Sequence, residues 1–212
     1  MSENFKGLDN LDKTVRKSAV IQERMGLISS YMYQQFLDYK QSTTNMLEIF
    51  DKIAENASMT IDYFKQSFAS RGMPTQNISI EQDKSIYYIG LNILWHKLGF
   101  VTSYNDKPKV LLRDDGNRII TSRITAFRGS FNDISAPTQE EFMSKLLELE
   151  VASLYIPADK TVSAIIKIKH LGDKEFRINQ MDAPREFLLK VVEIICGGGD
   201  YHEESYKKTI SI

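Results

Sequence analysis

The sequence has very little cysteine and no long apolar run. Its single cysteine, Cys196, cannot form an internal disulfide, which excludes a disulfide-stabilised scaffold and fits a reducing compartment. No stretch approaches the roughly 18 to 20 apolar residues that span a bilayer. The N-terminal segment MSENFKGLDNLDK has no apolar core of a signal peptide. We therefore expect a cytoplasmic protein that does not enter a membrane.

Proline and glycine are scarce as well, with five and 11 residues in a chain of 212, so few segments suit a flexible linker. The composition is 42% hydrophobic and 26% charged, which is ordinary for a folded protein and excludes intrinsic disorder. The chain is long enough for one large domain or two small ones. We predict an α+β fold.

The N-terminal third is rich in helical periodicity. Residues 11–69 contain no proline and one glycine, and their apolar residues recur every three or four positions. One stripe comprises Ile21, Met25, Ile28, Met32 and either Phe36 or Tyr39, and a second comprises Leu47, Phe50, Ala54, Ala57, Ile61, Phe64 and Phe68. The second stripe keeps a heptad phase. These stripes pack either in the chain's own core or in an oligomer-forming coiled coil.

Between the two stripes, residues 41–45 are polar and poor in helix formers. Asn45, with Glu48 three positions later, resembles a capping box at the start of a new helix. We therefore predict two helices that form a coiled-coil-like antiparallel hairpin over residues 8–72, in an interaction domain of residues 1–76. Gly72 and Pro74 end it.

Residues 77–212 are expected to form a second domain with a mostly antiparallel sheet and packing helices. A helix is predicted over 83–98, a β-hairpin over 109–113 and 118–127, and a helix over 139–149 with Thr138 as its N-cap. Three antiparallel strands are predicted at 152–156, 162–170 and 174–179, and a last helix runs from Asp182 to Cys196.

The residue types that carry catalysis or bind metals are not grouped in this sequence. The three histidines lie in separate segments without the spacing of metal sites. Cys196 and His202 flank a triple glycine, but Cys196 ends a helix, where the dipole disfavours a thiolate. The sequence predicts no catalytic residue, no metal site and no cofactor, and it favours a protein that is not an enzyme.

A basic stretch is the sharpest functional pattern. Residues 97–128 carry seven basic and three acidic residues, a net charge of +4 in a chain of net charge −1. The predicted helix 83–98, followed by a basic hairpin, resembles the helix and wing of a winged-helix domain, which implies nucleic-acid binding. The residues concerned are Lys107, Lys109, Arg113, Arg118, Arg123 and Arg128. An ordinary solvated face of a sheet explains the same charges.

The leading functional hypothesis is a non-enzymatic interaction or structural subunit of a homo-oligomer or a larger intracellular complex. Methionine and aromatic side chains adapt well to partner surfaces. The expected protein-contact residues are Met25, Met32, Leu47, Phe50, Ile61 and Phe64. The alternative is a nucleic-acid-binding protein that uses the basic stretch.

Overall fold

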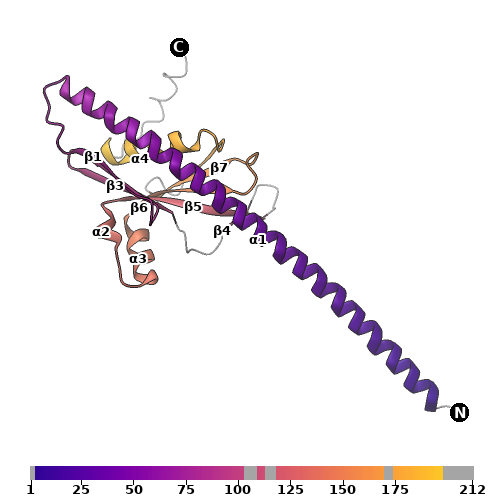
Figure 1. The fold of residues 1–212 in the computed structure, drawn as a ribbon. Coiled ribbons are helices and arrows are strands. Elements are labelled where there is room, and N and C mark those ends of the chain that lie inside the picture. Colours follow the sequence, from indigo (N-terminus) through magenta and orange to yellow (C-terminus); the bar gives the residue numbers. More distant parts are fainter. Residues whose placement is uncertain (1–2, 103–108, 113–117, 170–173, 198–212) are drawn as a thin grey trace.

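The structure is a computed structural model that describes residues 3–102, 109–112, 118–169 and 174–197, with side chains described from Lys17 onward except at 109, 111, 112 and 118. The described residues form an α+β fold built on one antiparallel sheet of eight strands. A long helix α1 (Glu3–Ala69) and helix α4 (Ala183–Cys196) cover one face of the sheet, and the short helices α2 (Phe131–Ile134) and α3 (Gln139–Leu149) lie on the other (Figure 1).

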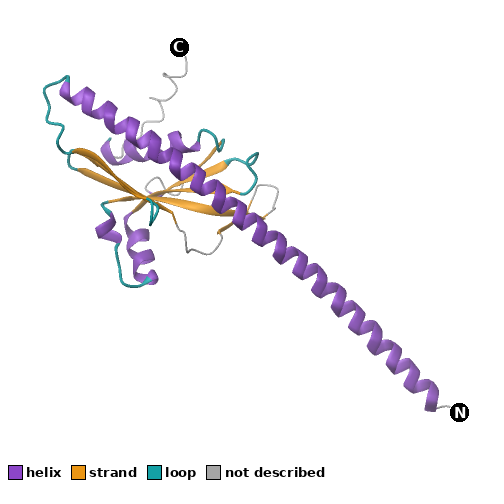
Figure 2. Ribbon diagram, in the orientation of Figure 1, coloured by secondary structure: helices purple, strands orange, loops and turns teal. Residues whose placement is uncertain are grey.

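The strands follow one another in a meander. They are β1 (Ile78–Asp83), β2 (Tyr88–Ile93), β3 (His96–Thr102), β4 (Lys109–Leu112), β5 (Arg118–Arg128), β6 (Glu150–Pro157), β7 (Ala164–Ile168) and β8 (Lys174–Ile178). Their order in the sheet is β1-β2-β3-β5-β6-β7-β8, and β4 pairs with the N-terminal half of β5. Figure 2 shows the strands in orange and the helices in purple. The short connections from β1 to β2, from β2 to β3, from β6 to β7 and from β7 to β8 require antiparallel pairing.

Most of the C-terminal predictions are confirmed. The hairpin β4–β5, helix α3, the strands β6 to β8 and helix α4 lie where the sequence places them. The Thr138 hydroxyl accepts a hydrogen bond from the Glu141 backbone N–H at 3.3 Å, so the predicted N-cap of α3 is present. Local capping and turn chemistry was sufficient for these elements.

Helix α1 is a single helix, and the predicted break at 42–45 is wrong. Its 67 residues span about 100 Å. The polar residues there face polar parts of the sheet instead of starting a new helix: Ser42 Oγ lies 2.9 Å from Ser122 Oγ on β5, and Asn45 Nδ2 donates to the carbonyl oxygens of Pro157 and Ala158 at 3.0 and 2.7 Å. Ser42 and Asn45 are buried hydrogen-bonding residues of the interface between α1 and the sheet, which is why they interrupt an apolar stripe.

The predicted helix over 83–98 is also wrong, because this segment forms β2 and parts of β1 and β3. Ile89, Leu91 and Ile93 alternate along β2 and are buried on the face of the sheet that contacts α1. Leu94, in the turn between β2 and β3, has a φ of 59° and so adopts a left-handed conformation that ends any helix there. Without this helix, the resemblance to a winged-helix domain is lost.

The second face of the sheet contains a close aromatic contact. Gly90 and Gly99 are paired across β2 and β3, and a Cβ on Gly99 would lie 2.3 Å from the Phe127 ring. The Tyr88 and Phe127 rings pack over these glycines beneath α2 and α3, and Tyr88 Oη accepts a hydrogen bond from the Phe131 backbone N–H at 3.2 Å. The glycines are therefore required by packing.

Candidate protein interface on helix α1

Helix α1 has two parts with opposite environments. From Ser42 to Phe68 it packs on the sheet and on α4, whereas its N-terminal part extends beyond the sheet (Figure 1). We call residues 17–38 the arm. Ten large hydrophobic side chains of the arm are exposed, namely Val20, Ile21, Met25, Leu27, Ile28, Tyr31, Met32, Tyr33, Phe36 and Leu37. A helix with so many uncovered apolar side chains is unusual for a chain that acts alone.

The exposed apolar face of the arm is a continuation of the buried face of the same helix. Ile28, Tyr31 and Met32 precede Met46, Ile49 and Phe50 by 18 residues, which is about five helical turns, so each pair points in the same direction. Met46, Ile49 and Phe50 lie in the core between α1 and the sheet, but no part of the described chain covers their counterparts in the arm. The arm thus presents a core-like face.

Polar residues of the arm lie mostly beside or behind this face. Gln22, Ser29 and Ser30 are exposed on the flank and the back of the helix. Lys17, Arg24 and Asp38 border the apolar face, and Asp38 Oδ1 accepts a hydrogen bond from Gln34 Nε2 at 2.9 Å. The arm therefore combines an apolar seam with a small number of charges that can fix the orientation of a bound partner.

The predicted protein-contact residues fall into two groups. Met25 and Met32 are about 60% exposed on the arm. Phe50 and Ile61 are buried in the core, and Leu47 and Phe64 pack against it, so these four contact the chain's own sheet and helices. Tyr31, which sequence reasoning missed, belongs to the exposed face, and its position one helical turn after Ile28 is the signal that identifies it.

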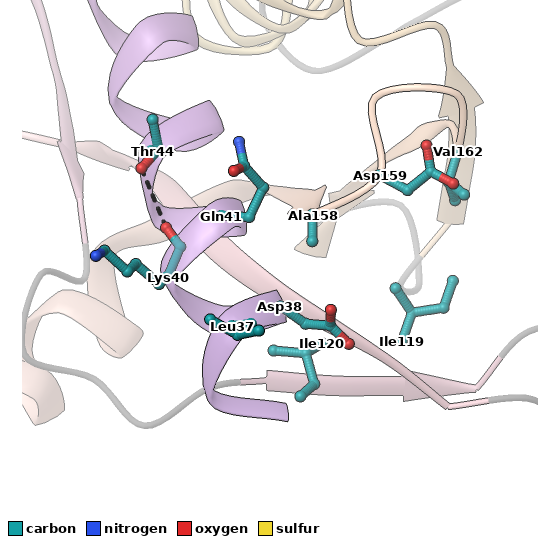
Figure 3. A pocket seen from close by; sticks show the side chains of 10 residues that line it. All are labelled: Leu37, Asp38, Lys40, Gln41, Thr44, Ile119, Ile120, Ala158, Asp159 and Val162. Atoms are coloured by element: carbon teal, nitrogen blue, oxygen red, sulfur yellow. Dashed lines mark hydrogen bonds between the residues drawn. The ribbon is translucent and has the colours of Figure 1, made fainter. Parts of the chain in front are cut away.

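An open cavity lies where the arm meets the sheet. It has a volume of about 730 Å³, and Asp38, Lys40 and Gln41 of α1 line one side while Ile120 of β5 and Asp159 of the loop after β6 line the other (Figure 3). The lining mixes apolar and charged side chains. Across the described residues, no group of three or more His, Cys, Asp or Glu side chains is placed to hold a metal ion. Neither feature indicates a reaction at this cavity.

The basic stretch is only partly placed by the structure. Arg128 is exposed, whereas the Arg123 side chain is buried within the sheet. Lys107 and Arg113 lie outside the described residues, as do the side chains of Lys109 and Arg118, whose backbones form parts of β4 and β5. Nucleic-acid binding stays a prediction from the sequence, and buried Arg123 is not available to contact a phosphate.

Cys196 has the properties of a structural cysteine. It is half-buried at the end of α4 and packs against the core, and burial raises the pKa of its thiol. A raised pKa leaves less of the reactive thiolate. His202 lies outside the described residues.

None of the helices in the described part of the chain combines the length and the apolar character needed to cross a bilayer.

Comparison of the chain with protein-family models, with curated protein sequences and with solved structures finds no match in any of the three. The function is therefore inferred from the chain itself.

Proposed function

We propose that this protein is a non-enzymatic assembly subunit whose helical arm binds another protein chain through its apolar face. The single observation that carries this proposal is the continuity of that face with the core. The same helical face that Met46 and Phe50 bury against the sheet runs on through Ile28 and Met32 without a covering element among the described residues. Burial of such side chains in a partner is favourable by about 1.5–3 kcal/mol each.

The side chains of the arm are of the kinds that dominate protein interfaces. Methionine and aromatic residues are enriched in such interfaces, because they bring a large contact area and adapt to the partner's shape. The exposed face contains Met25, Met32, Tyr31 and Phe36 together with two isoleucines. Its charges are few and of both signs, which supports a protein partner more than an anionic surface.

The packing of α1 on the sheet also supports the proposal, because it holds the arm in a fixed direction. Where the helix meets the sheet, Ser42 and Asn45 make buried hydrogen bonds to β5 and to the loop after β6, and Lys160 Nζ forms an ion pair of 2.6 Å with Glu48 Oε2. An interface element held rigidly loses less conformational entropy on binding.

The test compares two double variants of the arm. In the face variant, Ile28→Asp with Met32→Asp, two charges are placed on the apolar face. In the control variant, Gln22→Asp with Ser30→Asp, the same number of charges is added to the same helix away from that face. Both proteins are compared with the wild type by sedimentation velocity over a range of concentrations, and by quantitative mass spectrometry of the proteins that co-purify from the native source.

We expect the face variant to lose association or the specific partner, because a buried unpaired carboxylate is costly, while the control variant keeps it. Far-UV circular dichroism of both variants checks that the sheet and helices are intact. If the face variant keeps every association of the wild type, the arm is not a protein interface and the proposal fails.

A further inference from the structure

A second row of exposed residues lies on helix α1, outside the arm and beside α4. We call it the outer row, and it comprises Lys52, Asn56, Met59, Tyr63 and Gln66. Its alternating steps of four and three residues are the spacing of the two core positions in a coiled coil. Met59 and Tyr63 are 63% and 68% exposed, so the described part of the chain leaves them largely uncovered.

The outer row borders an apolar groove between α1 and α4. The groove has a volume of about 330 Å³. Its apolar side chains are Met59, Tyr63, Phe64, Leu188, Leu189 and Val192. Asn45 of α1 and Gln180, which precedes α4, both donate a hydrogen bond to the carbonyl oxygen of Pro157. The two helices therefore start at the same end of the sheet and run in the same direction, with the groove between them (Figure 1).

The apolar face of the arm repeats the spacing of the outer row. We call Ile21, Met25, Ile28, Met32 and Gln35 the seam of the arm. Each seam residue precedes one residue of the outer row by 31 positions, so the steps of four and three occur in the same order in both rows. In parallel coiled coils, core positions face the equivalent positions of the other helix. The two rows therefore match in a parallel register.

Given that the arm is a protein interface, we propose that its occupant is the outer row and the adjoining groove of a second copy of this chain, bound in parallel with an offset of 31 residues. In this register, Ile28 lies against Met59 of the second copy, and Met32 lies against its Tyr63. These two layers bring together the exposed apolar side chains of both rows. Their burial provides the main favourable free energy of the contact.

The residues at the two ends of the matched rows are also compatible. Gln35 lies against Gln66 of the second copy, where each amide can donate a hydrogen bond to the other. At the opposite end, Ile21 lies on the aliphatic stem of Lys52, whose ammonium group reaches water. Lys52 is the only charged residue in the two rows, so the contact leaves no unpaired charge buried.

The contact also explains why the apolar surface of the arm is wider than one seam. Val20, Leu27 and Tyr31 each precede a seam residue by one position and are exposed. On the second copy, Thr60 and Phe64 follow the outer row by one position and line the groove on the side of α4. In parallel helices, the row that precedes the seam of one lies beside the row that follows the seam of the other. The second apolar row of the arm therefore lies over α4.

The direction and the offset agree with the way α1 packs on its own sheet. The sheet begins to cover α1 at Ser42, which makes a buried hydrogen bond to β5. With an offset of 31, Ser42 is level with Met73 of the second copy, past the end of its α1 at Ala69. An offset of 24 makes Ser42 level with Gln66, so the sheet would overlap the last turns of the neighbouring helix. An antiparallel pair directs the neighbouring helix into the space of the sheet and is excluded in the same way.

The part of α1 that precedes the arm also has space in this arrangement. Residues 3–16 of the first copy run beside residues 34–47 of the second copy. They lie on the side of the second copy's α1 where Gln41 and Thr44 are exposed. The sheet of the second copy lies on the side of Ser42 and Met46, so it does not obstruct the helix of the first copy.

The arm and the outer row are different surfaces of one chain, so the contact is heterologous. Each copy that binds through its arm still offers its own groove to another arm. Copies therefore join head to tail, and successive copies are displaced by about 47 Å along α1, at 1.5 Å for each of the 31 residues.

The first test is disulfide trapping in a Cys196→Ser background, which removes the native thiol. Ile28→Cys and Met59→Cys are made as two separate proteins with different tags, mixed and oxidised. We expect a disulfide between the two proteins and very little within either one, because facing core positions come within the Cα separation of about 7 Å that a disulfide requires. The matched control mixes Ile21→Cys with Met59→Cys, which is one heptad out of register. No trapping of the first pair, or equal trapping of the control pair, would overturn the proposal.

The second test mixes two blocked proteins. The face variant, Ile28→Asp with Met32→Asp, has a blocked arm and an intact groove, whereas the groove variant, Met59→Asp with Tyr63→Asp, has an intact arm. We expect each protein alone to show a dissociation constant at least about 100-fold higher than the wild type, because carboxylates are costly to bury. An equimolar mixture should form a 1:1 complex and nothing longer, since only one contact can be made.

Sedimentation velocity measures the mixture and its components, and far-UV circular dichroism checks that both variants are folded. A mixture of folded variants that stays monomeric would overturn the head-to-tail contact. The wild type should instead form longer assemblies as its concentration rises.

The result for self-assembly is distinguishable from the result for the arm as an interface. A wild-type chain that stays monomeric at every concentration overturns self-assembly, and so does a groove variant that keeps the association that the face variant loses. The arm is then judged by partner retention in the face variant against the control variant, Gln22→Asp with Ser30→Asp. Loss of a specific partner in the face variant alone would leave the proposed function standing with a different occupant.

Discussion

Two isoleucines on the same face of α1 provide a direct test of the two environments of this helix. Ile53 is completely buried between the helix and the sheet, whereas Ile28 is 52% exposed on the arm. The substitutions Ile53→Ala and Ile28→Ala remove the same atoms from the same helix. Any difference between them therefore reports what surrounds each side chain.

For a single chain, the two changes are expected to differ strongly in cost. Ile53→Ala removes a side chain from the core and leaves a cavity, which lowers the free energy of unfolding by about 2–5 kcal/mol. That is a large part of the 5–15 kcal/mol that is typical of a domain. Ile28→Ala loses few contacts within the chain, and alanine has the higher helix propensity, so the change is expected to stay within about 0.5 kcal/mol.

For the dissociation constant of the assembled protein, we expect the opposite order, with the larger effect from Ile28→Ala. Ile28→Ala removes apolar surface from the proposed protein interface, at about 0.8 kcal/mol for each buried methylene. Three carbon atoms are lost from the arm, so the dissociation constant of the complex with the partner should rise at least about ten-fold. Ile53→Ala should leave the dissociation constant nearly unchanged wherever the chain is folded.

The assay is urea unfolding followed by far-UV circular dichroism, at a concentration where sedimentation shows monomers. The slope with denaturant must agree among the three proteins for the midpoints to report stability. If Ile28→Ala lowers the midpoint as much as Ile53→Ala does, the arm is packed within its own chain, and the proposed function loses its basis.

Further predictions concern the sheet and the thiol. Asn45→Ala should lower the free energy of unfolding by about 1–3 kcal/mol in urea unfolding, because two buried loop carbonyls lose their donor; an unchanged midpoint would contradict this. Gly99→Ala should cost about 1–3 kcal/mol in the same assay, since its Cβ meets the Phe127 ring. Burial raises the pKa of Tyr88 above its ordinary value of 10.0. The stability that the protonated Tyr88 provides is therefore complete below the pKa of the unfolded state, and it is lost as the pH rises through the raised pKa of the folded state. Tyr88→Phe should reduce the loss of unfolding free energy measured from about pH 8 to about pH 11. Iodoacetamide should alkylate Cys196 more slowly in the folded than in the urea-unfolded protein, and equal rates would show that the thiol is not shielded.

Local signals predicted the C-terminal elements because those signals are complete in the sequence. Thr138 with Glu141 caps α3, and Pro184 lies in the first turn of α4. The turns between β6, β7 and β8 are short, so these neighbouring strands can pair only in the antiparallel direction. In each case the residues that decide the structure are neighbours in the chain.

The two wrong predictions involve residues whose partners are distant in the chain. Ser42 and Asn45 look like a helix break until Ser122 and the loop after β6 are placed beside them. The segment 83–98 fits both a helical and an alternating pattern, and its pairing with β1 and β3 decides in favour of strands. Sequence periodicity does not contain this information.

The arm shows most clearly what sequence periodicity alone does not predict. Ile28 and Met46 are equivalent by every local criterion, since both are apolar residues on one face of one continuous helix. The extent of the sheet makes them different, because the sheet reaches Met46 and does not reach Ile28. A stripe therefore identifies which face of a helix is buried, and only the tertiary structure tells which part of the stripe is left for another chain.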